Sequence, residues 1–230
     1  MRGAKVILLL IVALSSGCAR FPANPTPGGV ARIIVELRLD GRVKPEYLYF
    51  AVINFSNDSF GAAGPVPVVQ PPWGNGFAAG AFTHFVLYSG VRGGYGLFQG
   101  SPLITLDASI PLGPPSSFEP VGTDSRILRF EVDLTQFIPD VDDARAMRFA
   151  QVNLMCADRA PIDPHDQASR FWEAFGDGRS PADLSRFITI RLDQNRIYRN
   201  VDFAQLEPSG DVPDPDLDLI DWSIEVRTLE

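Results

Sequence analysis

The amino-acid sequence predicts an all-β protein, a two-layer β-sandwich of the jelly-roll or immunoglobulin-like type with one or two short helices. Runs of strand length, rich in β-branched and aromatic residues, recur along the chain. Glycine and proline, at 20 residues each, separate these runs. Helix signals are confined to a few short segments. Strands joined by turns bury their apolar faces best as two packed sheets.

The first two expected strands, 31–39 and 47–55, differ in their patterns. "ARIIVELRL" alternates in part, whereas "YLYFAVINF" is apolar on both faces. An antiparallel strand with one solvent face alternates apolar and polar side chains. We therefore expect the second strand to be covered on both faces, by a second sheet on one and by loops on the other. The proline-rich segment 64–77 is the candidate cover.

Further runs of strand length follow at 81–90, 94–108, 125–137, 148–157, 187–192 and 219–227. The clearest alternation lies in "SRILRFEVDLTQF" and in "LIDWSIEVR", where Trp222 and Val226 share one apolar face. Period-two alternation predicts strands with one buried face. These two runs are therefore expected to be half-exposed strands that contribute to a core.

Helical content is expected to be small. The segment 166–178 predicts two helical turns that end at Gly176 or Gly178. A second start signal is Ser180 as a cap followed by Pro181 at the first helical position. The segment 140–147 is expected to be a turn that enters a short helix.

The N-terminus has the layout of a secretory signal. Arg2 and Lys5 precede the apolar run Val6–Leu14, and small residues follow. A helix over this run and the small residues would reach roughly 18 Å at about 1.5 Å per residue. A bilayer core is about 30 Å thick, so the segment is too short for a permanent span.

The sequence "LSSGC" resembles the lipobox of bacterial lipoproteins, although Ser15 stands where that class most often has Leu. The resemblance covers residues 1–18 only. It implies cleavage before Cys18, attachment of a diacylglycerol to its sulfur, and acylation of its new amino group with a fatty acid such as palmitate. Three acyl chains anchor a protein permanently, because one chain binds a membrane marginally and two bind it stably.

These features divide the chain into three parts. Residues 1–17 are expected to be the signal peptide, 18–30 the lipidated cysteine with a flexible tether, and 31–230 a single β-sandwich domain. The resemblance implies export and lipid anchoring to the bacterial cell envelope. Ala19 follows the cysteine where an aspartate would retain an enterobacterial lipoprotein at the inner membrane. This favours the outer membrane in an organism that has one.

Charge and cysteine content limit the partners. Residues 1–17 hold two basic groups and no acidic group, which leaves 18 basic against 28 acidic groups, a net charge of −10. No cluster of Lys and Arg is present, so nucleic acid is excluded as a partner. If Cys18 is acylated, Cys156 has no intramolecular partner, and its apolar surroundings predict a buried small hydrophobe.

The most unusual segment is 73–98, where aromatic residues are interleaved with glycines. Candidate ligand-binding aromatics are Trp73, Phe77, Tyr88 and Tyr95. Exposed ring faces in glycine-rich loops can stack on sugar rings or receive a protein partner. The alternative is a loop that folds back over a sheet and buries its aromatic side chains.

The C-terminal segment carries closely spaced aspartates, of which Asp214, Asp216 and Asp218 are candidates for a metal site. In an extended chain these alternate side chains would share one face. Calcium takes six to eight oxygens, and Pro213 and Pro215 stiffen the segment against curling around an ion. The sequence therefore predicts a solvated acidic loop, no metal and no cofactor.

No motif for nucleophilic or metal-assisted hydrolysis is present in the sequence. We therefore expect a non-catalytic binding or structural role at the cell envelope, with a glycan or a protein as a candidate partner besides the membrane. One alternative is a carbohydrate-binding module that uses the aromatics of 73–98. A second is a glycoside hydrolase, which needs only two carboxylates.

Overall fold

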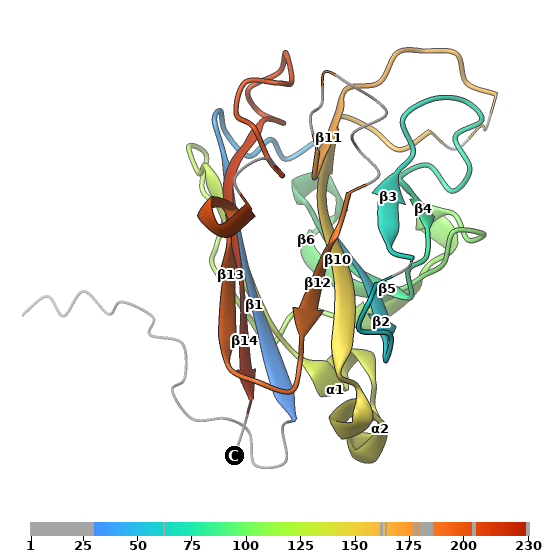
Figure 1. Ribbon diagram of the computed structural model, residues 1–230. Helices are drawn as coiled ribbons and strands as arrows, with labels where there is room; N and C mark the ends of the chain where they lie inside the picture. Colours follow the sequence, from blue (N-terminus) through green and yellow to red (C-terminus); the bar gives the residue numbers. More distant parts are fainter. Residues whose placement is uncertain are drawn as a thin grey trace, which may run out of the picture.

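The computed structural model describes residues 30–61, 63–161, 163, 165–176, 179, 186–203 and 206–228. These residues form an all-β sandwich in which two antiparallel sheets face each other (Figure 1). The fold class predicted from the sequence is therefore confirmed at the level of a β-sandwich.

One sheet has five strands among the described residues, in the order β13–β14–β1–β9–β8. Their bounds are β1 Ala31–Leu39, β8 Ser117–Phe118, β9 Ile127–Asp133, β13 Arg196–Arg199 and β14 Leu219–Thr228. The first and last strands pair along their whole length, from Ala31 opposite Thr228 to Leu39 opposite Leu219.

The other sheet follows the order β11–β10–β2–β5–β6–β7, and β12 also pairs with β10. The bounds are β2 Leu48–Ser56, β5 His84–Ser89, β6 Gly94–Gln99, β7 Ile110–Gly113, β10 Phe149–Ala157, β11 Trp172–Ala174 and β12 Ile188–Arg191. A separate ribbon pairs β3 Pro65–Pro67 with β4 Ala78–Gly80.

Helices are short. Among the described residues, the α-helices are α1 Leu134–Phe137 and α2 Val141–Ala146, and the 3₁₀ turns are η1 Gly90–Arg92, η2 Leu106–Ala108 and η4 Asn200–Phe203. The short helix expected within 140–147 is confirmed as α2, where the Asp140 side chain accepts the N–H groups of Asp142 and Asp143. Within the described part of the chain, no helix has the length and apolar character needed to cross a bilayer.

Several sequence-based expectations about element type are corrected, including the strand expected over 125–137, whose residues Leu134–Phe137 form helix α1. The helix expected over 166–178 is absent from its described residues, where Trp172–Ala174 forms strand β11 instead. The edge of β10 that does not pair with β2 pairs with this segment, with Met155 opposite Ala174. Tertiary pairing thus overrides the local helix signal. The strand expected over 94–108 ends at Gln99. The helix expected to begin at Ser180 lies outside the described residues.

Strand β2 is buried on both faces, as its sequence predicts. Tyr49, Ala51 and Ile53 belong to the main core between the two sheets. Phe50 and Val52 belong to a second apolar cluster on the outer face of the larger sheet. The loop expected to cover this face does so, since Phe77 stacks on Phe50 with ring centroids 4.9 Å apart.

Trp222 lies on the inward face of β14 and is 2% exposed. Its ring centroid is 4.8 Å from that of Phe175 and 5.7 Å from that of Phe203. We predict that Trp222→Ala lowers the free energy of unfolding by about 3–5 kcal/mol, because truncation of a buried aromatic leaves a cavity. Urea titration of the domain, residues 31–230, measures this loss.

Trp222→Phe is the matched control. Trp222 Nε1 donates no hydrogen bond to a described residue, so Phe removes volume but no polar contact and is expected to cost less than Ala. An unchanged unfolding midpoint for Trp222→Ala would contradict the inward placement of this strand face.

His84 is a buried histidine in β5. Its ring packs on Phe55 and Phe137 at centroid distances of 5.4 and 5.1 Å, and Nδ1 lies 2.9 Å from Thr83 Oγ1. Burial lowers the pKa of His84 to about 4, against a smaller opposing effect of the Phe137 backbone. The folded state therefore favours the neutral ring.

We predict that His84 makes the domain sensitive to acid. Because its folded pKa lies below its unfolded value of about 6.5, its contribution to stability is complete above pH 6.5 and is lost as pH falls towards 4. When the pH falls from 7 to 4.5, the free energy of unfolding of the unsubstituted domain should fall by about 2–3 kcal/mol more than that of the variant His84→Gln. Equal losses in urea titrations at the two pH values would contradict this assignment.

Candidate functional site

The four candidate aromatics do not form one binding face. Trp73 and Phe77 are 3% and 1% exposed on the outer side of the larger sheet. Tyr88 and Tyr95 are half-buried and pack against the core between the sheets, with ring centroids 4.8 Å apart. Trp73 and Phe77 therefore offer no exposed ring face on which a sugar could stack. The sequence left open either exposed ligand-binding rings or a loop that buries its rings over a sheet. Trp73 and Phe77 match the second interpretation.

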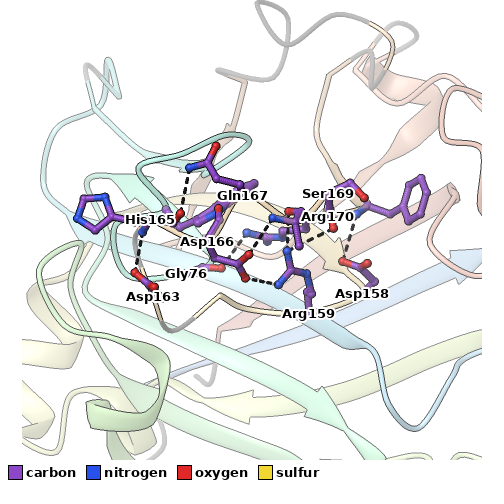
Figure 2. Close-up of polar contacts among 12 residues, drawn as sticks. Gly76, Asp158, Arg159, Asp163, His165, Asp166, Gln167, Ser169 and Arg170 are labelled. Carbon is purple, nitrogen blue, oxygen red and sulfur yellow. Dashed lines mark hydrogen bonds and ion pairs between the residues drawn. The ribbon is translucent and has the colours of Figure 1, made fainter.

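Two arginines fasten the loop 158–171 (Figure 2). Arg159 Nη1 donates to Asp166 Oδ2 at 2.5 Å, and Arg159 Nη2 donates to the Ala168 carbonyl at 2.6 Å. Arg170 Nη1 donates to the Gly76 carbonyl at 2.8 Å. These contacts join the loop to itself and to the aromatic segment.

Trp73 completes this connection. Its Nε1 donates to the Asp166 carbonyl at 2.6 Å, and the Arg170 guanidinium carbon lies 5.7 Å from its ring centroid. Burial lowers the pKa of Arg170 to about 10, which still leaves it charged at neutral pH. These hydrogen bonds and the cation–π contact thus join the loops 64–77 and 158–171 into one cover over the larger sheet. The network accounts for how the two loops are held in position.

The three candidate aspartates of the tail point in different directions. Asp214 Oδ2 accepts the Tyr47 hydroxyl at 2.7 Å. Asp216 accepts the Arg42 N–H at 2.6 Å and pairs with Lys44 Nζ at 3.2 Å. Asp218 is buried. The extended chain expected here is wrong: the N–H groups of residues 217 and 218 both donate to the Asp214 carbonyl, which closes a turn.

Asp218 meets two other buried carboxylates, those of Glu173 and Asp211. One oxygen from each of the three lies within 4.8 Å of the others. The exposed fractions are 0% for Glu173, 5% for Asp211 and 3% for Asp218. Glu173 is brought there by β11, in which it pairs with Cys156, a residue of the main core. We call these three residues the buried carboxylate cluster.

The buried carboxylate cluster is electrostatically costly. Burial and then the charge of Asp211 raise the pKa of Glu173 to about 9, against the backbone N–H groups of Ala174 and Leu219. Burial also raises the pKa of Asp218, although the Gly210 N–H lies 2.9 and 3.1 Å from its two oxygens. Like charges in a dry site repel strongly, so the cluster needs a proton or a cation.

Sequence reasoning missed Glu173 as a member of this cluster. It lies 38 residues before Asp211 and inside a segment with a helical signal, so no local pattern connects the two. The strand pairing of β11 and the turn at 214–218 bring the three side chains together. Strand alternation within "FWEAF" is the one signal that could have placed Glu173 on a buried face.

Cys156 and His84 do not form a catalytic pair. Cys156 lies opposite Tyr49 and His84 opposite Ile53 in the strand register. These positions are four residues apart along β2, about 13 Å. Burial raises the pKa of the Cys156 thiol well above its ordinary value. A buried, protonated thiol without a base is not a nucleophile.

Cys18 and the predicted signal segment lie outside the described residues. Comparisons with family models, curated proteins and solved structures gave no match to this chain.

Proposed function

We propose that this chain is a lipid-anchored lipoprotein of the bacterial cell envelope whose β-sandwich domain has a non-catalytic binding or structural role. The observation that carries the proposal is the N-terminal sequence, in which Val6–Leu14 and three small residues lead directly to Cys18. The proline-rich tether 19–30 then precedes the first strand. Such a linker separates a folded domain from a lipid surface.

The fold is compatible with attachment at one end. The domain begins at Ala31, which lies opposite Thr228, whereas Leu39 and Leu219 meet at the other end of the sheet. The two ends are about 25 Å apart along β1. Loops 40–47, 158–171 and 206–218 lie together at the end away from Ala31 (Figure 1). In an anchored domain these loops would face away from the bilayer.

The buried carboxylates give no support to a glycoside hydrolase. Such an enzyme needs two carboxylates that flank a bound sugar in an accessible cleft. Glu173 and Asp218, which the fold does bring together, are closed off from solvent. A carbohydrate-binding module is likewise disfavoured, because Trp73 and Phe77 are buried.

We predict that Cys18→Ser releases the protein from the membrane fraction or leaves an uncut precursor, because the acceptor sulfur is lost. Cys156→Ser is the matched control and should remain membrane-bound, since it leaves the anchor intact. Membrane fractionation with mass spectrometry of the mature N-terminus measures both. An unmodified amine at any residue other than Cys18 in the unsubstituted protein would overturn the lipoprotein proposal.

A further inference from the structure

We propose that Glu173, Asp211 and Asp218 bind one calcium ion at the end of the sandwich where Leu39 and Leu219 pair. This inference stands on the folded domain alone and does not depend on lipidation of Cys18. It replaces the sequence-based expectation of an acidic loop without a metal.

The spacing of the oxygens fits one calcium ion. Calcium–oxygen distances are about 2.3–2.6 Å, so two ligands on opposite sides of the ion are about 5 Å apart. The three carboxylates each place an oxygen within 4.8 Å of the others. Each residue offers one such oxygen, and water, backbone carbonyls or second carboxylate oxygens would supply the rest of the six to eight ligands that calcium takes. Magnesium prefers distances of about 2.0–2.1 Å and strict octahedral geometry.

An unpartnered oxygen of Glu173 is the second observation. Glu173 is fully buried, and its Oε1 accepts the Ala174 N–H at 3.1 Å. Its Oε2 has no donor at hydrogen-bond geometry among the residues that the structure describes, although the Leu219 N–H lies close enough to the carboxylate to lower its pKa. A buried carboxylate oxygen without a donor is strongly destabilising. A bound cation would satisfy it.

At Glu173 and Asp218, described basic side chains do not take this role. Within the described ranges, no Lys or Arg lies at ion-pair distance from Glu173 or Asp218. The cluster offers carboxylate oxygens alone, without histidine nitrogen. Such a hard donor set favours calcium over zinc, which prefers nitrogen and sulfur ligands.

The position of the cluster gives the ion a structural consequence. Glu173 lies in β11 at the edge of the larger sheet, and Asp218 directly precedes β14 of the five-stranded sheet. One ion bound to both would connect the two layers of the sandwich. We therefore expect calcium to stabilise the whole fold rather than one loop.

The test is calcium titration of the full-length chain, purified in detergent and stripped with EDTA. Isothermal titration calorimetry should show one calcium ion per chain. At calcium concentrations about 100 times the dissociation constant, the melting temperature should rise by roughly 5–10 °C. Magnesium at the same concentration should give a smaller rise.

Four variants locate the site. Glu173→Gln and Asp218→Asn should abolish the binding heat and the rise in melting temperature. Glu46→Gln and Asp202→Asn make the same chemical changes at exposed positions and should retain both. Near-UV circular dichroism checks that each variant is folded, and the titration of the unsubstituted chain remains decisive if a cluster variant does not fold.

The competing explanation is a cluster held together by shared protons. It predicts no calcium heat and no change in melting temperature in the unsubstituted chain, and either result would overturn the proposal. Calcium binding that survives in folded Glu173→Gln and Asp218→Asn would also overturn it. A rise with magnesium equal to that with calcium would overturn the assignment to calcium.

Discussion

The burial of β2 and β10 on both faces is the constraint on which the rest of the structure depends. A sheet in a simple sandwich needs an apolar partner on one face only. Here Phe50 and Val52 point away from the main core and still require cover. The chain supplies it with the loops 64–77 and 158–171, which Arg159 and Arg170 hold in place. The proline, aromatic and arginine residues of these loops therefore cover the outer apolar face of the larger sheet and hold the cover in place.

The same constraint buries polar groups that must then be satisfied. Asn153 in β10 is fully buried, and its Nδ2 donates to the carbonyls of Pro65 and Arg186 at 3.1 and 2.8 Å. Its Oδ1 accepts the Phe175 N–H at 3.1 Å. One side chain thus connects three segments distant in sequence. Glu173, two residues before Phe175, is buried by the same packing, but its Oε2 finds no such donor among the described residues.

The sequence predicts the parts of the fold that depend on local alternation. The runs 31–39 and 219–227 form strands, as does the 127–133 part of the expected strand 125–137, and the two apolar faces of 47–55 correctly indicate cover on both sides. The predicted element type is wrong where tertiary pairing decides between helix and strand, as at Trp172–Ala174. The prediction is also wrong where β9 continues into α1, because the buried Leu134 and Phe137 extend the apolar pattern past the end of the strand.

The candidate site was less predictable than the fold. Asp218 stands out in the sequence only as one of several tail aspartates, and its expected neighbours Asp214 and Asp216 turn to other partners. Its actual neighbour Glu173 is 45 residues away. Carboxylates that converge only through sheet topology leave no spacing signal, and only the three-dimensional arrangement reveals them.

A structure from crystals grown in the presence of calcium is the most direct test of whether a cation offsets the negative charge of the buried carboxylate cluster. The predicted result is one anomalous density peak about 2.3–2.6 Å from oxygens of Glu173, Asp211 and Asp218. The contradictory result is the same three carboxyl groups hydrogen-bonded to one another, with no peak between them.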